Sequence, residues 1–145
     1  MQISEIMTKS VVTVQQDDFI RSVKAQFEEQ EFHHLLVVDQ GIIQGVISDR
    51  DLFKILSPFC DTPCEQRRDM EILNKRAHQI MSRNPITVRP DTSIKDAFMV
   101  LTEQRISCLP VTSESGKVLG IVSWKDLLRA AFTVLDASCW EESGQ

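Results

Sequence analysis

The chain has 145 residues, of which 42% are hydrophobic and 26% charged, the balance of a folded globular protein rather than a disordered one. Its formal net charge is −5 and its pI is about 5.2, so it carries no basic field that would attract nucleic acid or an anionic membrane. There is neither an apolar run of membrane-spanning length nor a signal-peptide pattern, and we therefore expect a cytoplasmic protein with no membrane association.

The first half of the chain predicts a strand, a helix, two strands and a second helix. The β-branched run Val11–Val14 predicts the first strand, and Asp17–Asp18 is expected to cap the helix that follows. The apolar positions of this helix are Phe19, Ile20, Val23 and Phe27. Leu35–Val38 is continuously apolar and predicts a strand buried on both faces. A turn leads to the strand Ile42–Ile47, and a helix from Asp49 ends before a proline.

Residues 59–79 break this pattern and are expected to form a connector. Its charged part, Glu65–His78, predicts a helix with Met70, Leu73 and Ala77 on one side. Cys60 and Cys64 have a spacing found in zinc sites, with His78 as a distant third ligand. No second Cys or His pair completes the usual four ligands, so we predict no metal site and free cysteine thiols.

The second half repeats the first. Ile80–Val88 matches Ile6–Val14, Ile94–Leu101 repeats the helix, and Cys108–Val111 matches His34–Val37. The last strand and helix are expected at 118–122 and 125–135, the helix with Leu127, Leu128, Ala131 and Leu135 as its apolar positions. We therefore predict an α/β (α+β) fold of two tandem β-α-β-β-α units. Each unit is too short to bury its sheet alone, so the two should pack through their sheets about a pseudo-two-fold axis. The expected boundaries are 1–58, 59–79, 80–136 and a tail, 137–145.

One motif is written twice, as Gly45–Leu52 and as Gly120–Leu127, with Gly, Ser, Asp and Leu at identical spacing. Each copy ends a buried strand and begins a helix. The serine stands where a helix N-cap belongs and the aspartate follows three residues later, which is a variant of the capping box. Helix capping alone would explain one copy of the motif, whereas the repetition of the motif favours a functional role for its serine and aspartate.

These motifs together resemble the cystathionine-β-synthase (CBS) domain. The resemblance rests on Ile-Met-Thr/Ser, on the Thr-Val that ends the first strand, on Leu-Leu/Pro-Val and on the Gly-to-Leu motif, in the same order twice. Two such domains in tandem look like a Bateman module. The resemblance implies two clefts between the domains, homodimerisation, and binding of AMP, ADP, ATP or S-adenosylmethionine. It also implies a regulatory, non-catalytic role without a required cofactor, in which the module acts on a separate, unidentified partner. The chain looks like a stand-alone sensor.

The nucleotide-binding residues that the resemblance implies are Ser48, Arg50, Asp51, Ser123, Lys125 and Asp126. A carboxylate suits a ribose because it accepts hydrogen bonds from both hydroxyls. The serines at the helix starts can reach a sugar hydroxyl or a phosphate oxygen. Since the aspartates oppose the positive end of the helix dipole, the phosphate should lie toward the two cations. Arginine can bind a phosphate through two parallel hydrogen bonds, whereas lysine cannot. The first site, with Arg50, is therefore expected to bind phosphate more tightly than the second, with Lys125.

The pocket residues that the resemblance implies are Val12, Thr13, His34, Ile86, Thr87 and Pro110, which would form an apolar slot for the base. Each of them is equally compatible with a place in the core. The second copy has Trp124 and Lys125 where the first has Asp49 and Arg50, so we expect the two sites to differ in affinity.

One alternative function remains open, and two others are disfavoured. The alternative is a protein-interaction module with vestigial, non-binding clefts, in which the repeated serine and aspartate act only as caps. An enzyme is disfavoured because the sequence shows no arrangement of nucleophile, base and orienting residue, and DNA binding is disfavoured by the acidic balance.

Overall fold

The computed structural model describes residues 1–56, 58, 62–64 and 66–143, and of residues 137–143 it describes the backbone alone. Cys60 of the candidate metal pair therefore lies outside the described residues. The chain forms two compact units. One comprises Val12–Pro85, and the other joins Met1–Val11 to Ile86–Gln145.

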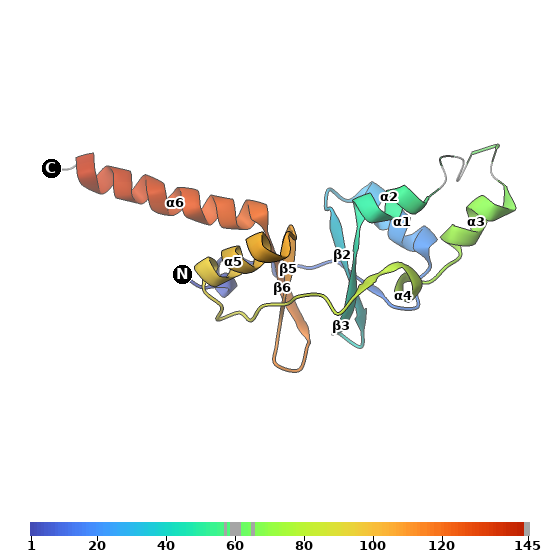
Figure 1. Cartoon of the computed structure of the whole chain (residues 1–145), viewed down its shortest axis with the longest axis horizontal. Helices are drawn as coiled ribbons and strands as arrows, with labels where there is room; N and C mark the ends of the chain where they lie inside the picture. Colours follow the sequence, from blue (N-terminus) through green and yellow to red (C-terminus); the bar gives the residue numbers. More distant parts are fainter. Residues whose placement is uncertain (57, 59–61, 65, 144–145) are drawn as a thin grey trace. The chain divides into compact units, whose positions relative to one another are not determined.

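The unit Val12–Pro85 is built on a four-stranded sheet in the order β1-β2-β3-β4. Strand β1 (Thr13–Gln15) is parallel to β2 (His34–Asp39), which is antiparallel to β3 (Ile42–Ser48), and the short β4 (Ser82–Arg83) pairs with the other edge of β3. The helices are α1 (Ile20–Glu29), α2 (Asp49–Ile55), α3 (Arg67–Leu73) and α4 (Ala77–Ile80). Helices α1 and α2 lie on the same side of β2 and β3 (Figure 1). The predicted β-α-β-β-α order is confirmed.

The core of this unit follows from the two periodicities of the sequence. Leu35 and Val37 alternate along β2 and pack with the apolar face of α1, whose residues Ile20, Val23 and Phe27 are buried. Leu36 and Val38 are buried as well, which confirms that this strand is buried on both faces.

Two local predictions in this unit are wrong. The N-cap of α1 is Phe19 rather than Asp17 or Asp18, because the Asp18 carboxylate instead accepts a hydrogen bond from the Gln15 N–H at 2.8 Å. Phe19 is exposed, with the guanidinium of Arg76 4.0 Å above its ring. The single helix predicted over Glu65–His78 is interrupted, because α3 ends at Leu73 and α4 begins at Ala77. Met70 of α3 is exposed, while Asp69 is buried and its carboxylate accepts the Gln66 N–H at the start of the helix.

The other unit repeats this topology with η1 (Ile3–Glu5), α5 (Ile94–Gln104), the antiparallel pair β5 (Cys108–Thr112) and β6 (Val118–Ser123), and α6 (Trp124–Ser143). Val88 forms a parallel bridge with Val111, as β1 does with β2. Thr8 forms an antiparallel bridge with Ile121, as β4 does with β3. The core of this unit comprises Ile3, Val88, Ala97, Leu101, Leu109, Val111, Val122 and Leu127.

The segment that begins each sequence repeat pairs with the strand of the other repeat. Ser82–Arg83, from the start of the second repeat, pairs with β3, and Thr8, from the start of the first, pairs with Ile121 of β6. The motif glycines make this approach possible. A Cβ atom on Gly45 would lie 2.6 Å from the Ser82 carbonyl oxygen, and one on Gly120 would lie 2.9 Å from that of Thr8. The Ile-Met-Thr/Ser segment of one repeat and the motif glycine of the other are thus in direct contact.

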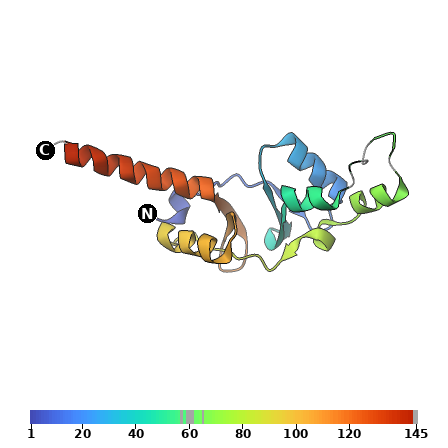
Figure 2. The ribbon, with the colours of Figure 1, turned by 45° about the horizontal axis from the view of Figure 1, so that its top comes forward.

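Helix α6 is longer than predicted. It continues past Leu135 to Ser143, and its C-terminal half extends beyond α5 and the strands of its unit (Figures 1 and 2). Of the predicted apolar positions only Leu127 is buried, whereas Leu128, Ala131 and Leu135 are exposed; Ala130, which was not predicted, is buried as well. No helix in the described part of the chain combines the length and apolar character needed to span a membrane.

Candidate ligand-binding motifs

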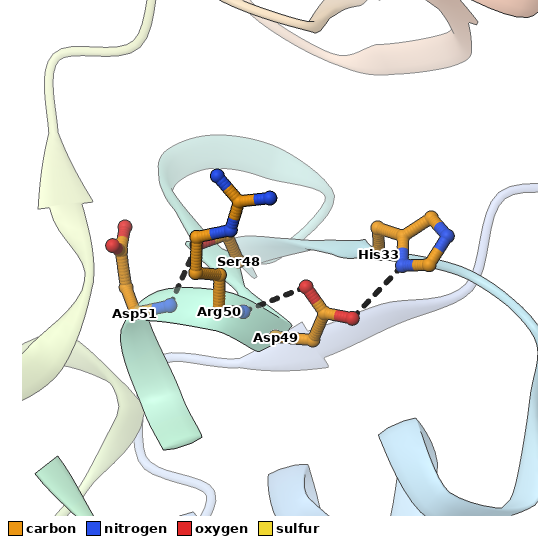
Figure 3. A network of polar contacts seen from close by, with 5 residues as sticks. All are labelled: His33, Ser48, Asp49, Arg50 and Asp51. Atoms are coloured by element: carbon orange, nitrogen blue, oxygen red, sulfur yellow. Dashed lines mark hydrogen bonds and ion pairs between the residues drawn. The ribbon is translucent and has the colours of Figure 1, made fainter. Parts of the chain in front are cut away.

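The first motif stands at the junction of β3 and α2. Ser48 is the N-cap of α2, and its hydroxyl accepts a hydrogen bond from the Asp51 N–H at 3.1 Å. The Asp51 carboxylate does not return the bond that a full capping box would contain, and its side chain is exposed. Figure 3 shows the carboxylate of Asp51 and the guanidinium of Arg50 pointing to the same side, away from α2. A cation and an anion are therefore presented together at this junction.

Asp49 joins this junction to the start of β2. Its Oδ2 lies 2.8 Å from Nδ1 of His33, and its Oδ1 accepts the Arg50 N–H at 2.6 Å (Figure 3). The backbone N–H of Asp49 also donates a hydrogen bond to the His33 carbonyl oxygen at 2.9 Å. His33 is therefore a member of this cluster. Of the adjacent His33-His34 pair, only His34 was predicted among the pocket residues.

Two pKa values are shifted in this cluster. Partial burial acts to raise the pKa of the Asp49 carboxyl, but hydrogen bonds from His33 and from the Arg50 N–H outweigh it and hold that pKa below its usual value. Burial lowers the pKa of His34, against the opposing charges of Asp49 and Asp51. A neutral His34 therefore lies beside an ionised Asp49 at neutral pH.

The second motif satisfies the start of α6 differently. The Oδ2 atom of Asp126 accepts the Ser123 N–H at 2.9 Å and lies 3.1 Å from the Ser123 hydroxyl, which donates to it. Its Oδ1 is 3.8 Å from a guanidinium nitrogen of Arg129. The side chain of Asp126 is only 15% exposed. The predicted capping box is thus divided between the two copies: the serine hydroxyl caps α2, and the aspartate carboxylate caps α6.

Trp124 takes the place of Asp49 in the second copy. Its backbone N–H donates to the Ser107 carbonyl at 3.1 Å, as that of Asp49 does to His33, while its indole N–H donates to the Ile106 carbonyl at 3.1 Å. The indole also meets the Phe98 ring edge to face, with 5.6 Å between centroids. The Trp124 side chain therefore packs against α5 and the segment that follows it.

The predicted pocket residues are divided between the two units, three in each. In the first unit, Thr13 pairs with Leu36 on the neighbouring strand, and His34 lies opposite Ser48. Val12 is exposed, and Thr13 and His34 are half-buried. In the other unit, Ile86 and Thr87 are exposed and Pro110 is buried, its carbonyl accepting the Val88 N–H at 3.0 Å. Lys125, like Arg50, is exposed.

The described residues offer no arrangement for a metal ion: no three His, Cys, Asp or Glu side chains among them converge on a common point. Cys64 and Cys108 are free thiols, as predicted. Burial raises the pKa of the Cys108 thiol to about 11, so that it stays protonated and unreactive.

Comparison with known proteins places both repeats in one class. The CBS domain model matches residues 3–58 and 77–133. A CBS domain-containing protein of Dictyostelium discoideum is 30% identical over 136 residues, which cover 92% of this chain and 93% of that protein. The crystal structure of CBSX2 of Arabidopsis thaliana in complex with AMP is similar with a TM-score of 0.77 and 26% identity, over 92% of this chain and 97% of the other. A protein of Methanocaldococcus jannaschii has the same TM-score at 25% identity, and there the match spans 89% of this chain and only 47% of the other.

Proposed function

Since the chain belongs to the CBS domain family, with two such domains in tandem, we propose that it is a regulatory module that binds an adenine nucleotide and relays its binding to a separate protein. The observation that carries the proposal is the similarity, over nearly the whole chain, to CBSX2, which was solved with AMP. AMP is therefore the first ligand to test, and ADP, ATP and S-adenosylmethionine follow from the sequence resemblance.

The first motif supplies chemistry that fits such a ligand. A nucleotide presents two ribose hydroxyls, which are donors, and a phosphate, which is an anionic acceptor. Asp51 is an exposed carboxylate, Arg50 is an exposed guanidinium beside it, and both point to one side of α2 (Figure 3). The ionised Asp49 beside them is engaged by His33, which leaves Arg50 able to meet a phosphate. We place the ribose at Asp51 and the phosphate at Arg50.

Thermal denaturation of the purified protein with AMP, ADP, ATP and S-adenosylmethionine tests the proposal. A ligand that binds the folded state alone stabilises it by about 2.7 kcal/mol at a hundredfold excess over its dissociation constant. We expect AMP to raise the midpoint in a concentration-dependent way and guanosine monophosphate, at equal charge, to raise it much less. If no adenine compound shifts the midpoint at millimolar concentration, the ligand-sensing function is wrong and the interaction module takes its place.

We also propose that the module is a homodimer formed through α6. Leu128, Phe132 and Leu135 are 70%, 71% and 63% exposed, and they follow one another at spacings of four and three residues. That is the heptad spacing by which two helices pack side by side, and one helix can meet its own copy in a self-complementary interface. The apolar stripe therefore fits a second copy of this helix.

Light scattering on the Phe132→Glu variant tests the dimer. A buried glutamate in an apolar helix pair is unfavourable, so the variant should elute as a monomer where the unchanged protein is a dimer. Phe53→Glu is the matched control, because Phe53 occupies the position in α2 that Leu128 has in α6 and is 48% exposed. A monomeric unchanged protein, or a dimer that survives Phe132→Glu, would rule out this interface.

A further inference from the structure

We propose that the two copies of the motif have divided their tasks: Asp51 is the ribose-binding carboxylate, whereas Asp126 is the permanent cap of α6, so that each chain binds one nucleotide. This inference rests on the proposed function and adds to it the number of sites and their location. Its starting point is the difference in hydrogen bonding between two otherwise equivalent aspartates.

The Asp126 carboxylate is committed to its own chain. Its Oδ2 accepts the backbone N–H and the hydroxyl of Ser123, and its Oδ1 faces Arg129 at 3.8 Å. Binding both hydroxyls of a ribose requires acceptor positions on the carboxylate that are free and accessible. To provide them, Asp126 would have to leave Ser123, and the part-buried Ser123 N–H would then lose its acceptor. The loss of a helix cap corresponds to an affinity roughly two- to thirtyfold weaker.

The Asp51 carboxylate carries no such cost. The hydroxyl of Ser48 already caps α2, so Asp51 can engage a ligand while the cap stays in place. In the described part of the chain no hydrogen bond or ion pair holds its carboxylate, and its side chain is exposed. Its neighbour Arg50 points to the same side (Figure 3), whereas the second copy offers a lysine in that position. Affinity for ribose and for phosphate therefore favours the same junction.

Titration calorimetry with AMP, paired with thermal denaturation of the ligand-free protein, tests this division on the full chain with the Asp51→Ala and Asp126→Ala variants. We expect one AMP per chain for the unchanged protein. Asp51→Ala should weaken AMP binding at least tenfold and leave the ligand-free midpoint within about a degree. Asp126→Ala should lower that midpoint by about 2–6 °C, the shift expected for one lost cap, and keep one site of nearly unchanged affinity.

The conservative variant separates capping from general damage. Asp126→Asn keeps an acceptor oxygen for the Ser123 N–H and should recover most of the midpoint that Asp126→Ala loses. Two AMP per chain, or loss of binding in Asp126→Ala at an unchanged ligand-free midpoint, would overturn the inference. If the unchanged protein gives no heat with AMP, the proposed function fails for AMP, and the ligand-free midpoints still decide the capping roles: equal midpoints for the two alanine variants overturn the division.

Discussion

The junctions β3–α2 and β6–α6 are built on the same backbone and finished by different side chains. In both, the first helical N–H donates to the carbonyl of the residue just before the first strand of the antiparallel pair. Asp49 donates to His33, before β2, at 2.9 Å, and Trp124 donates to Ser107, before β5, at 3.1 Å. The helix start is then satisfied by the hydroxyl of Ser48 in one case and by the carboxylate of Asp126 in the other. The same four motif residues therefore permit two capping arrangements, and only the first leaves the carboxylate exposed.

The surfaces of the two units differ as well. On the helices of the first unit, Lys24 and Glu28 of α1 form an ion pair with 2.6 Å between their charged atoms. On α5, the positions aligned with Lys24 and Ala25 are Phe98 and Met99, which are exposed, and α6 adds its apolar stripe. The exposed Arg50 and Asp51 thus lie in one unit, and the most exposed large apolar side chains lie in the other. This distribution fits the proposal of a module that binds its ligand with one half and associates with the other.

The largest expected effect concerns the motif glycines, Gly45 and Gly120, which the two units have in common. Gly45→Ala should lower the free energy of unfolding by about 2–3 kcal/mol, because the new methyl group meets the Ser82 carbonyl and the Met81 side chain, both at 2.6 Å. Gly120→Ala should cost about 1–2 kcal/mol, since the corresponding distances to Thr8 and Met7 are 2.9 and 2.8 Å. Urea denaturation measures both.

Gly41 provides the control for these glycines. Its φ is +80°, a conformation that asparagine tolerates, and nothing lies within 4 Å of a Cβ atom built on it. Gly41→Asn should therefore cost much less than either motif alanine. If Gly45→Ala is as stable as the unchanged protein, the segments that begin the repeats are not held where the structure has them.

A smaller effect concerns the helix caps, in which the two junctions differ. Ser48→Ala removes the acceptor of the Asp51 N–H and should lower the free energy of unfolding by about 1 kcal/mol. Ser123→Ala removes only a hydroxyl that donates to Asp126, and the Ser123 N–H keeps its acceptor, so the loss should be a few tenths of a kcal/mol. Equal losses in urea denaturation would contradict the division of the cap.

Sequence reasoning predicted the parts of this molecule that depend on local pattern. The order of strands and helices, the doubly buried strand at Leu35–Val38 and the family all follow from periodicity and repetition. The exchange of the segments that begin the repeats could not be found in this way. Alternation indicates that Thr8 and Ser82 border strands but does not name the strand with which each one pairs.

The candidate site, too, could be predicted from the sequence only in part. The motif predicted that Ser48 and Asp51 meet at a helix start, and they do. It could not predict which of the two side chains would act as the cap, because the hydroxyl and the carboxylate differ little as acceptors for a helix start. That choice depends on the rotamers and neighbours that each unit supplies. Whether these residues bind a nucleotide stays a prediction.

The smallest expected effect concerns pH and belongs to the first junction alone. Burial lowers the pKa of His34 below its unfolded value of 6.5, so the unfolded chain binds more protons than the folded one as the pH falls below about 7.5. The stability that the neutral His34 contributes is therefore complete above about pH 7.5 and is lost as the pH falls through 6.5 toward the lowered pKa of the folded state. The lowered pKa of Asp49 acts in the same direction at a lower pH, near its unfolded value of 3.8.

Urea denaturation between pH 8.5 and 5.5 separates this contribution. The unchanged protein should lose more stability than His34→Gln between pH 7.5 and 5.5, while the two should run parallel between pH 8.5 and 7.5. The groups that face His34 are Asp49, Asp51 and His33, and the two carboxylates oppose the effect of burial, so the difference should stay below about 1 kcal/mol. Because the second copy has Cys108 at the position of His34, its junction has no histidine to titrate in this range. Curves that are parallel over the whole range would show that His34 is as well solvated in the folded protein as in the unfolded chain.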